Sequence, residues 1–182
     1  MRLLLYLALI ITSSSLGVSN HSTDVLSVEE LRTQTIIYPD SADLHVRLAL
    51  RYLEKGTVRG RALAIKHLRE AVELCPDNFN YHMLLAEVYL DATYWRYGVN
   101  QLIKAIRIRR DTRAYSLLGK AYMEKALEGW QDNWFKRALR VLSKAVEADS
   151  LNIEATKSLA LCYFDIGKAD SCLLYTSPSP RD

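Results

Sequence analysis

The cysteines and histidines are the residues of this chain that could bind a metal ion or act as nucleophiles. Cys75 and Cys162 form no Cys-x-x-Cys pair and have no histidine beside them. We therefore expect packing residues and not a metal site or a disulfide framework. His45 and His82 lack the spacing of a metal-ligand motif, and we interpret them as equivalent positions of an internal repeat.

Arginines and tryptophans could contribute binding chemistry. Four arginines follow one another closely: Arg107, Arg109, Arg110 and Arg113. They could hold phosphate or an acidic ligand, but we interpret them as a solvated helix end, where cations favour the helix dipole. Three tryptophans are expected to pack at the edge of the core, with contact to a partner as the alternative: Trp95, Trp130 and Trp134.

No catalytic constellation emerges from the sequence. It has no nucleophile elbow, no glycine-rich phosphate loop and no set of histidines with metal-ligand spacing. We therefore predict that the visible chain is not an enzyme and has no catalytic residue, no cofactor and no metal. Its function should come from the surfaces that its structural elements present.

The composition indicates a helical domain. The chain has 182 residues, of which 49% are hydrophobic and 25% charged, and it contains only 7 Gly and 4 Pro, few for a turn-rich β-protein. A formal net charge of +3 provides no bulk attraction to nucleic acid, so we expect no nucleic-acid partner.

Four segments of the chain superimpose without gaps: LALRYLEKG, LAEVYLDAT, LGKAYMEKA and LALCYFDIG. Each begins with a leucine and a small residue and has a tyrosine four positions after the leucine. These framework residues are Leu48, Ala49, Tyr52, Leu85, Ala86, Tyr89, Leu118, Gly119, Tyr122, Leu159, Ala160 and Tyr163.

A second pattern follows each of the first three segments. Small residues recur seven positions apart, with a leucine four positions after the first: Ala64, Leu68 and Ala71; Gly98, Leu102 and Ala105; Ala138, Leu142 and Ala145. Seven residues are about two helical turns. The two patterns together predict antiparallel helix pairs that stack on their neighbours.

This combined pattern resembles the tetratricopeptide repeat over residues 41–171. The resemblance implies an all-α fold, with antiparallel helix pairs stacked as a right-handed α-solenoid of about three and a half units. Arg110 and Ser150 stand where the family has a helix-ending proline. The surplus over the family's period falls around residues 56–60 and 128–133, where we expect longer exposed turns.

The resemblance also implies a protein-binding module whose first helices line a concave groove. The family's groove positions carry over to Val46, Leu50, Leu53, Met83, Glu87, Leu90, Ser116, Lys120 and Met123. The family's carboxylate clamp would need polar residues where this chain has Val46, Leu50, Leu84 and Leu117. We therefore expect an apolar or helical protein or peptide partner, with packing against another segment of the same chain as the alternative.

The N-terminal region has two parts. Residues 1–19 combine Arg2, the apolar run Leu3 to Ile11 and small polar residues, which is typical of a signal peptide. We expect an exported protein, periplasmic or extracellular, without a stable membrane span after cleavage, and an N-terminally anchored form as the alternative. Within residues 20–40, Ser27 to Glu30 form a capping box that predicts an edge helix.

The C-terminal segment 172–182, CLLYTSPSPRD, resembles the in-frame translation of a transposase sequencing adapter. We therefore expect the biological chain to continue past residue 171 and the fourth unit to lack its second helix here, which would leave Leu159, Tyr163 and Ile166 partly uncovered. An exported scaffold that binds proteins is the predicted function. The N-terminal repeat region of a longer exported enzyme is the alternative, and the sequence leaves the oligomeric state undetermined.

Overall fold

The computed structural model describes the backbone of residues 26–129 and 132–176 and the side chains of residues 26–128 and 133–167. This part of the chain contains eight α-helices and no strand: α2 (Val28–Ile37), α3 (Ala42–Glu54), α4 (Val58–Leu74), α5 (Phe79–Asp91), α6 (Trp95–Ile108), α7 (Thr112–Gly129), α8 (Asp132–Ala148) and α9 (Ile153–Thr176). The fold is an all-α helical-repeat solenoid, as the sequence predicts.

Helix α2 begins at the predicted capping box. The hydroxyl of Ser27 accepts a hydrogen bond from the backbone N–H of Glu30 at 3.3 Å, and the Glu30 carboxylate accepts one from the Ser27 N–H at 2.7 Å. Leu31 is buried, whereas Ile36 and Ile37 are 80% and 60% exposed. Because it presents so little apolar surface to α3, α2 is the edge helix of the stack.

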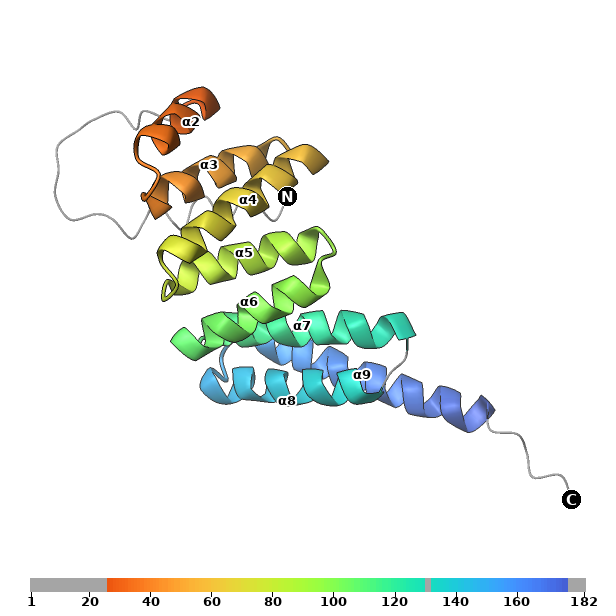
Figure 1. The fold of residues 1–182 in the computed structure, drawn as a ribbon. Helices are drawn as coiled ribbons and strands as arrows, with labels where there is room; N and C mark the ends of the chain where they lie inside the picture. The colour runs from red at the N-terminus through yellow and green to blue at the C-terminus, as the bar shows by residue number, and fades with distance from the viewer. Residues whose placement is uncertain (1–25, 130–131, 177–182) are drawn as a thin grey trace, which may run out of the picture.

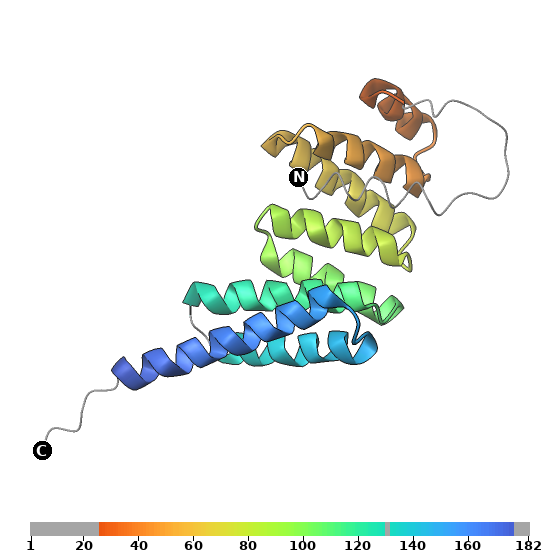
Figure 2. The same ribbon diagram turned by 180° about the vertical axis from the view of Figure 1, so that it is seen from behind.

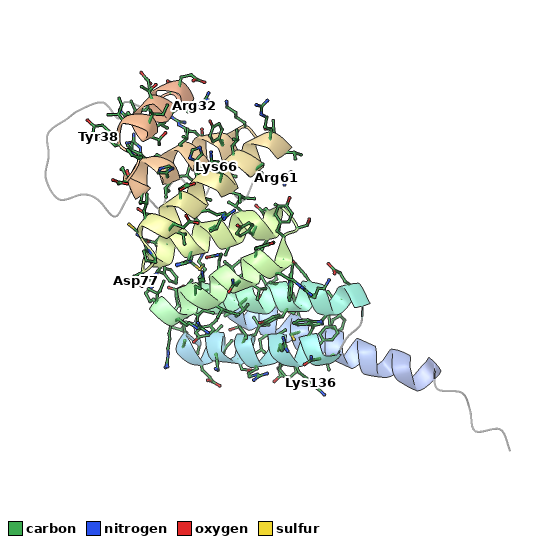
Figure 3. All side chains as sticks on the ribbon, in the orientation of Figure 1. Arg32, Tyr38, Arg61, Lys66, Asp77 and Lys136 are labelled. Carbon is green, nitrogen blue, oxygen red and sulfur yellow. The ribbon has the colours of Figure 1, made fainter. Side chains whose placement is uncertain are left out.

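The next six helices form three antiparallel pairs, α3 with α4, α5 with α6 and α7 with α8, and each pair packs on the next (Figure 1). Helix α9 packs against α8 and α7 at the far end of the stack, and its C-terminal half projects past its neighbours (Figure 2). Charged side chains such as Arg32, Asp77 and Lys136 lie at the outer margin (Figure 3). No described helix is both long enough and apolar enough to cross a membrane.

The core is made by the repeated small and large apolar residues. The second-helix residues Ala64, Leu68 and Ala71 are fully buried, and so are their equivalents in α6 and α8 that carry a side chain: Leu102, Ala105, Ala138, Leu142 and Ala145. Small residues allow the helix axes to approach, and the leucines fill the space between them. A Cβ on Gly98 would collide with the Leu90 side chain, and one on Gly119 would collide with Leu142.

The prediction of longer exposed turns was wrong, because the additional residues lengthen helices. Helices α7 and α8 have 18 and 17 residues, against 13 and 14 in α5 and α6. In the first unit α4 already begins at Val58 and has 17 residues. The spacing from Tyr122 to Ala138 exceeds that from Tyr89 to Gly98 by seven positions, 16 against 9. Seven residues are about two helical turns, so the additional turns leave both framework faces in register.

Candidate functional site: the surface of the first helices

The nine predicted groove residues divide into two sets in the structure. Val46, Met83, Ser116 and Met123 are buried and belong to the interior of the stack. The remaining five are half-buried on α3, α5 and α7, and their three leucines also pack against the core: Leu50, Leu53, Glu87, Leu90 and Lys120. We call these five residues, together with the exposed acidic residues Glu54, Asp91 and Glu124 of the same helices, the first-helix surface.

Ion pairs join consecutive first helices on this surface. Arg113 in the first turn of α7 donates to the Glu87 carboxylate of α5 at 3.0 Å. Lys120 in the middle of α7 pairs in the same way with Glu154 in the first turn of α9. A middle residue of one first helix therefore meets an early residue of the next. The two pairs have opposite polarity, since the middle residue is acidic in α5 and basic in α7.

Burial and crowding of carboxylates affect the charge of this surface. Burial, with the Asp91 charge second, raises the pKa of Glu87 to about 7, and the Arg113 guanidinium at 3.0 Å works against that rise by favouring the charged form. Burial and neighbouring carboxylates, Glu128 first, also raise the pKa of Glu124, while Lys120 opposes the rise. The acidic groups of α5 and α7 on this surface therefore lie close enough to repel one another.

The sequence interpretation overlooked an acidic position of the repeat. The residue two places after each framework tyrosine is acidic in every unit: Glu54, Asp91, Glu124 and Asp165. The signal is visible in the four aligned segments, which continue from the tyrosine as YLE, YLD, YME and YFD. The overlooked residues change the predicted surface from mostly apolar to apolar with an acidic row.

The two histidines at equivalent repeat positions make equivalent hydrogen bonds. Nε2 of His45 lies 3.1 Å from the carbonyl oxygen of Pro39, and Nε2 of His82 lies 2.8 Å from that of Pro76. Each proline lies in the turn between the preceding helix and the first helix of the unit. Both rings therefore attach the start of a first helix to the preceding turn, which supports their interpretation as repeat positions.

The other ring nitrogen of each histidine faces the second helix of its unit. Nδ1 of His45 lies 3.1 Å from Nδ1 of His67, and Nδ1 of His82 lies 2.7 Å from Oε1 of Gln101. A neutral His45 that donates to Pro39 through Nε2 accepts at Nδ1, so the proton between the two imidazoles belongs to His67.

The framework tyrosines of the first three units each contact a ring on their own second helix. Tyr52 stacks on His67 at 5.8 Å between ring centroids, and Tyr122 stacks on Trp134 at 5.7 Å. Tyr89 lies 5.4 Å from Tyr97, although the three partner rings come from different positions of their second helices. These three tyrosines are alike in being only 7 to 9% exposed and in contacting a ring of the second helix. Trp130, the third predicted tryptophan, lies outside the described residues.

The other residues considered for binding or catalysis either make structural contacts or lie far from other reactive side chains. Trp95 donates from Nε1 to the Ala121 carbonyl at 2.8 Å, which fits the predicted packing at the core edge. The Arg109 guanidinium lies 3.7 Å from the centroid of the Phe79 ring. Cys75 is exposed and Cys162 is buried, both as free thiols. Over the described ranges no three metal-ligating side chains come together.

Comparisons with known proteins were informative at the level of structure. No protein-family model matches the chain, and no curated protein matches its sequence. A crystal structure of MamA matches with a TM-score of 0.67 at 19% identity, covering 81% of each chain. YrrB, described as a TPR protein with an unusual peptide-binding site, matches with a TM-score of 0.59 at 19% identity, covering 81% of this chain and 71% of its own.

A third match is the first TPR of Spaghetti (RPAP3), bound to the HSP90 peptide SRMEEVD. Its TM-score is 0.58 at 20% identity, with 69% of this chain and 93% of that chain covered. This chain has the tetratricopeptide-repeat fold. At these identities the tetratricopeptide-repeat neighbours establish the architecture. The RPAP3 repeat holds a bound peptide, and YrrB is described as having a peptide-binding site.

Proposed function

We propose that this protein is an exported scaffold that binds a protein or peptide along the first-helix surface. The observation that carries the proposal is the tetratricopeptide-repeat fold with half-buried apolar side chains left on its first helices, namely Leu50, Leu53 and Leu90. In a stack of this kind the first helices present a continuous row of side chains to an extended or helical partner. Export is supported only by the signal-like composition of residues 1–19.

The charge of the surface narrows the class of partner. The peptide in the RPAP3 neighbour, SRMEEVD, carries three acidic residues. The first-helix surface of this chain carries Glu54, Asp91 and Glu124, and leucines or valine stand at the predicted clamp positions. An acidic peptide would meet like charges here, so we propose a partner that presents apolar side chains without acidic ones.

The absence of catalysis stays a prediction, and so does the alternative that the repeats precede a catalytic domain in a longer exported enzyme. No described residue favours that alternative. The oligomeric state and the exclusion of nucleic acid are likewise predictions.

The experiment that tests the proposal selects peptides from a displayed random 12-residue library against the folded protein and measures their affinities. Met83 is buried, so its substitution would disturb the core, and we choose Leu50→Glu with Leu53→Glu instead. We expect selected peptides to lose about tenfold or more in affinity, which corresponds to about 1.4 kcal/mol.

The matched control is Ile36→Glu with Ile37→Glu, which places the same charges on the exposed face of α2. It should leave the affinities unchanged, and circular dichroism should show native helicity for both double variants. Peptides that bind the Leu50/Leu53 variant as tightly as the unsubstituted protein would reject the first-helix surface as the binding site.

A further inference from the structure

The two kinds of helix in the repeat differ in charge. The second helices α4, α6 and α8 together contain 11 Lys and Arg against 4 Asp and Glu. The first helices α3, α5 and α7 contain 5 Lys and Arg against 6 Asp and Glu. The formal net charge of the whole chain is only +3. The excess of positive charge is therefore carried by the second helices and not by the helices of the first-helix surface.

Exposed cations recur at equivalent positions of α6 and α8. Arg96 and Lys136 each stand two positions before the first small residue of the second-helix pattern, and Lys104 and Lys144 each stand six positions after it. Arg140 lies between the two lysines of α8, four positions from each. All five side chains are exposed, and Lys136 is labelled at the outer margin of the stack in Figure 3. We call these five residues the basic surface.

The cations of the basic surface have no neutralising partners in the described part of the chain. Helix α6 contains no acidic residue, and α8 contains none between Asp132 and Glu147. None of the five cations forms an ion pair with another described residue. On the first helices, by contrast, Arg51, Arg113 and Lys120 are each paired with a carboxylate.

The spacing of the three cations of α8 makes them repel one another. Residues four positions apart lie on the same face of a helix, about 6 Å apart along its axis. That separation is shorter than the Debye length of about 8 Å at physiological ionic strength, so salt screens the repulsion only in part. Like charges at this spacing destabilise a helix. A bound polyanion would remove this repulsion, so the charge of the surface favours a partner with many negative groups.

Two features favour the headgroups of a lipid bilayer over other polyanions. The cations are distributed over two successive units, and a flat layer of mobile headgroups can meet such a broad array without a fitted groove. Residues 1–19 have the composition of a segment that either directs the chain across a membrane or anchors it there. On both expectations a bilayer is a polyanionic surface that the protein meets.

We propose that the basic surface docks the repeat stack on a bilayer that contains anionic lipids. The contact is peripheral, because exposed Lys and Arg side chains approach the headgroup phosphates and no described helix is long and apolar enough to cross the membrane. The first helices take no part in it. The first-helix surface therefore stays accessible to a partner while the stack lies on the membrane, and the membrane contact does not depend on the proposed function.

Sedimentation of the whole chain with lipid vesicles tests the proposal. Neutral phosphatidylcholine vesicles are compared with vesicles that contain about 30% anionic phosphatidylglycerol, at about 0.1 M salt. We expect binding to the anionic vesicles to be about tenfold or more tighter, and about 0.5 M salt to remove the difference by screening. The apolar residues 1–19 should contribute equally to both kinds of vesicle. Equal binding to neutral and anionic vesicles at low salt would overturn the proposal.

A triple variant locates the contact on α8. Lys136→Gln with Arg140→Gln and Lys144→Gln removes three exposed charges and retains good helix formers. We expect this variant to bind anionic vesicles about tenfold or more weakly than the unsubstituted protein, since each cation near the membrane contributes to the attraction. Circular dichroism should show native helicity.

The matched control is Arg47→Gln with Lys55→Gln and Lys157→Gln, which removes three exposed cations outside the basic surface and changes the net charge equally. It should retain most of the vesicle binding. An equal loss in both triple variants would mean that net charge and not the basic surface causes the binding. A short DNA duplex that binds the protein but not the α8 variant, without any binding to anionic vesicles, would make nucleic acid the occupant. Either result would overturn the proposal.

Discussion

Small residues at the contacts between helices set the distance between the helix axes, and Gly119 shows this most directly. Its position has no room for a Cβ against Leu142, a fully buried leucine, whereas the equivalent positions of the first two units hold Ala49 and Ala86. The third pair is thus packed more closely than alanine allows. Alanine therefore fits at this repeat position in the first two units, but in the third unit Leu142 lies too close for its Cβ.

Gly119→Ala should therefore destabilise the protein, although alanine is the better helix former. We expect a loss of about 1–3 kcal/mol, because overpacking a filled core forces Leu142 or the helix backbone to move. Thermal unfolding followed by circular dichroism measures the change. The control is Gly167→Ala, where a Cβ would meet no atom within 4 Å and helix propensity should leave stability equal or slightly higher. Equal effects at both glycines would contradict the close approach.

His67 gives the first unit a pH dependence. Burial lowers the pKa of His67 to about 4 from 6.5, with further lowering by His45, Lys66 and Arg32 and opposition from Glu70. Because the folded protein holds the His67 proton less tightly than the unfolded chain, stability is complete above pH 6.5 and falls as the pH drops towards 4. For a half-exposed ring we expect a loss of about 1–2 kcal/mol across this window.

The variant His67→Gln tests this expectation, because Gln101 occupies the equivalent place beside His82. Urea unfolding at pH 7 and at pH 4.5 should show a smaller loss on acidification for the variant than for the unsubstituted protein. An identical loss for both proteins would mean that other groups cause the pH dependence.

At the scale of the elements, the lengths of the helices vary while their faces stay in register. The first helices have 13, 13 and 18 residues, and the second helices have 17, 14 and 17. Additional turns at the ends of a pair extend past the neighbouring pair without moving the buried small residues. Helical turns can therefore be added beside the connecting turn of a helix pair without disturbing the stack.

The ends of the helices follow local chemistry. Thr57 accepts a hydrogen bond from the Gly60 N–H at 2.9 Å at the start of α4, and the Asn78 side chain caps α5. These caps satisfy backbone N–H groups that lack partners in the first turn. Such caps could be predicted from short sequence patterns. The length of the turn between Tyr52 and Ala64 could not, because the helix propensities of single residues do not say how far a helix extends when it packs against a partner.

At the scale of the whole molecule, the units share their buried clusters with their neighbours. Leu48, Leu68 and Leu85 belong to one buried cluster, although they come from α3, α4 and α5. The second cluster joins residues of α5 through α9, including Met83 and Cys162. Because consecutive helices contribute to shared clusters, a pair taken alone would expose part of its apolar surface, and binding at either end of the stack would add to its stability.

Export of the whole protein would determine the compartment in which the repeats bind a partner. We expect residues 1–171 fused to alkaline phosphatase to be active outside the bacterial cytoplasm, and the fusion of residues 20–171 to lose about tenfold or more of that activity, since an apolar stretch after a basic residue directs secretion. N-terminal sequencing would separate cleavage near Gly17 or Ser19 from a retained anchor. Equal activity of both fusions would contradict the signal-peptide prediction.

The sequence alone determined the repeat, its framework and the class of fold. Leucines, small residues and tyrosines at fixed spacing specify which helix faces must meet, because that information is periodic and local. The capping box of α2 and the equivalence of His45 and His82 followed from the same kind of evidence.

Only the tertiary structure decided which predicted surface residues remain accessible. Val46, Met83, Ser116 and Met123 occupy the family's groove positions, yet neighbouring helices bury them. The pairing of Glu87 with Arg113 also depends on side chains from different units. The physical reason is that burial depends on the distance between stacked helices, which local spacing does not contain.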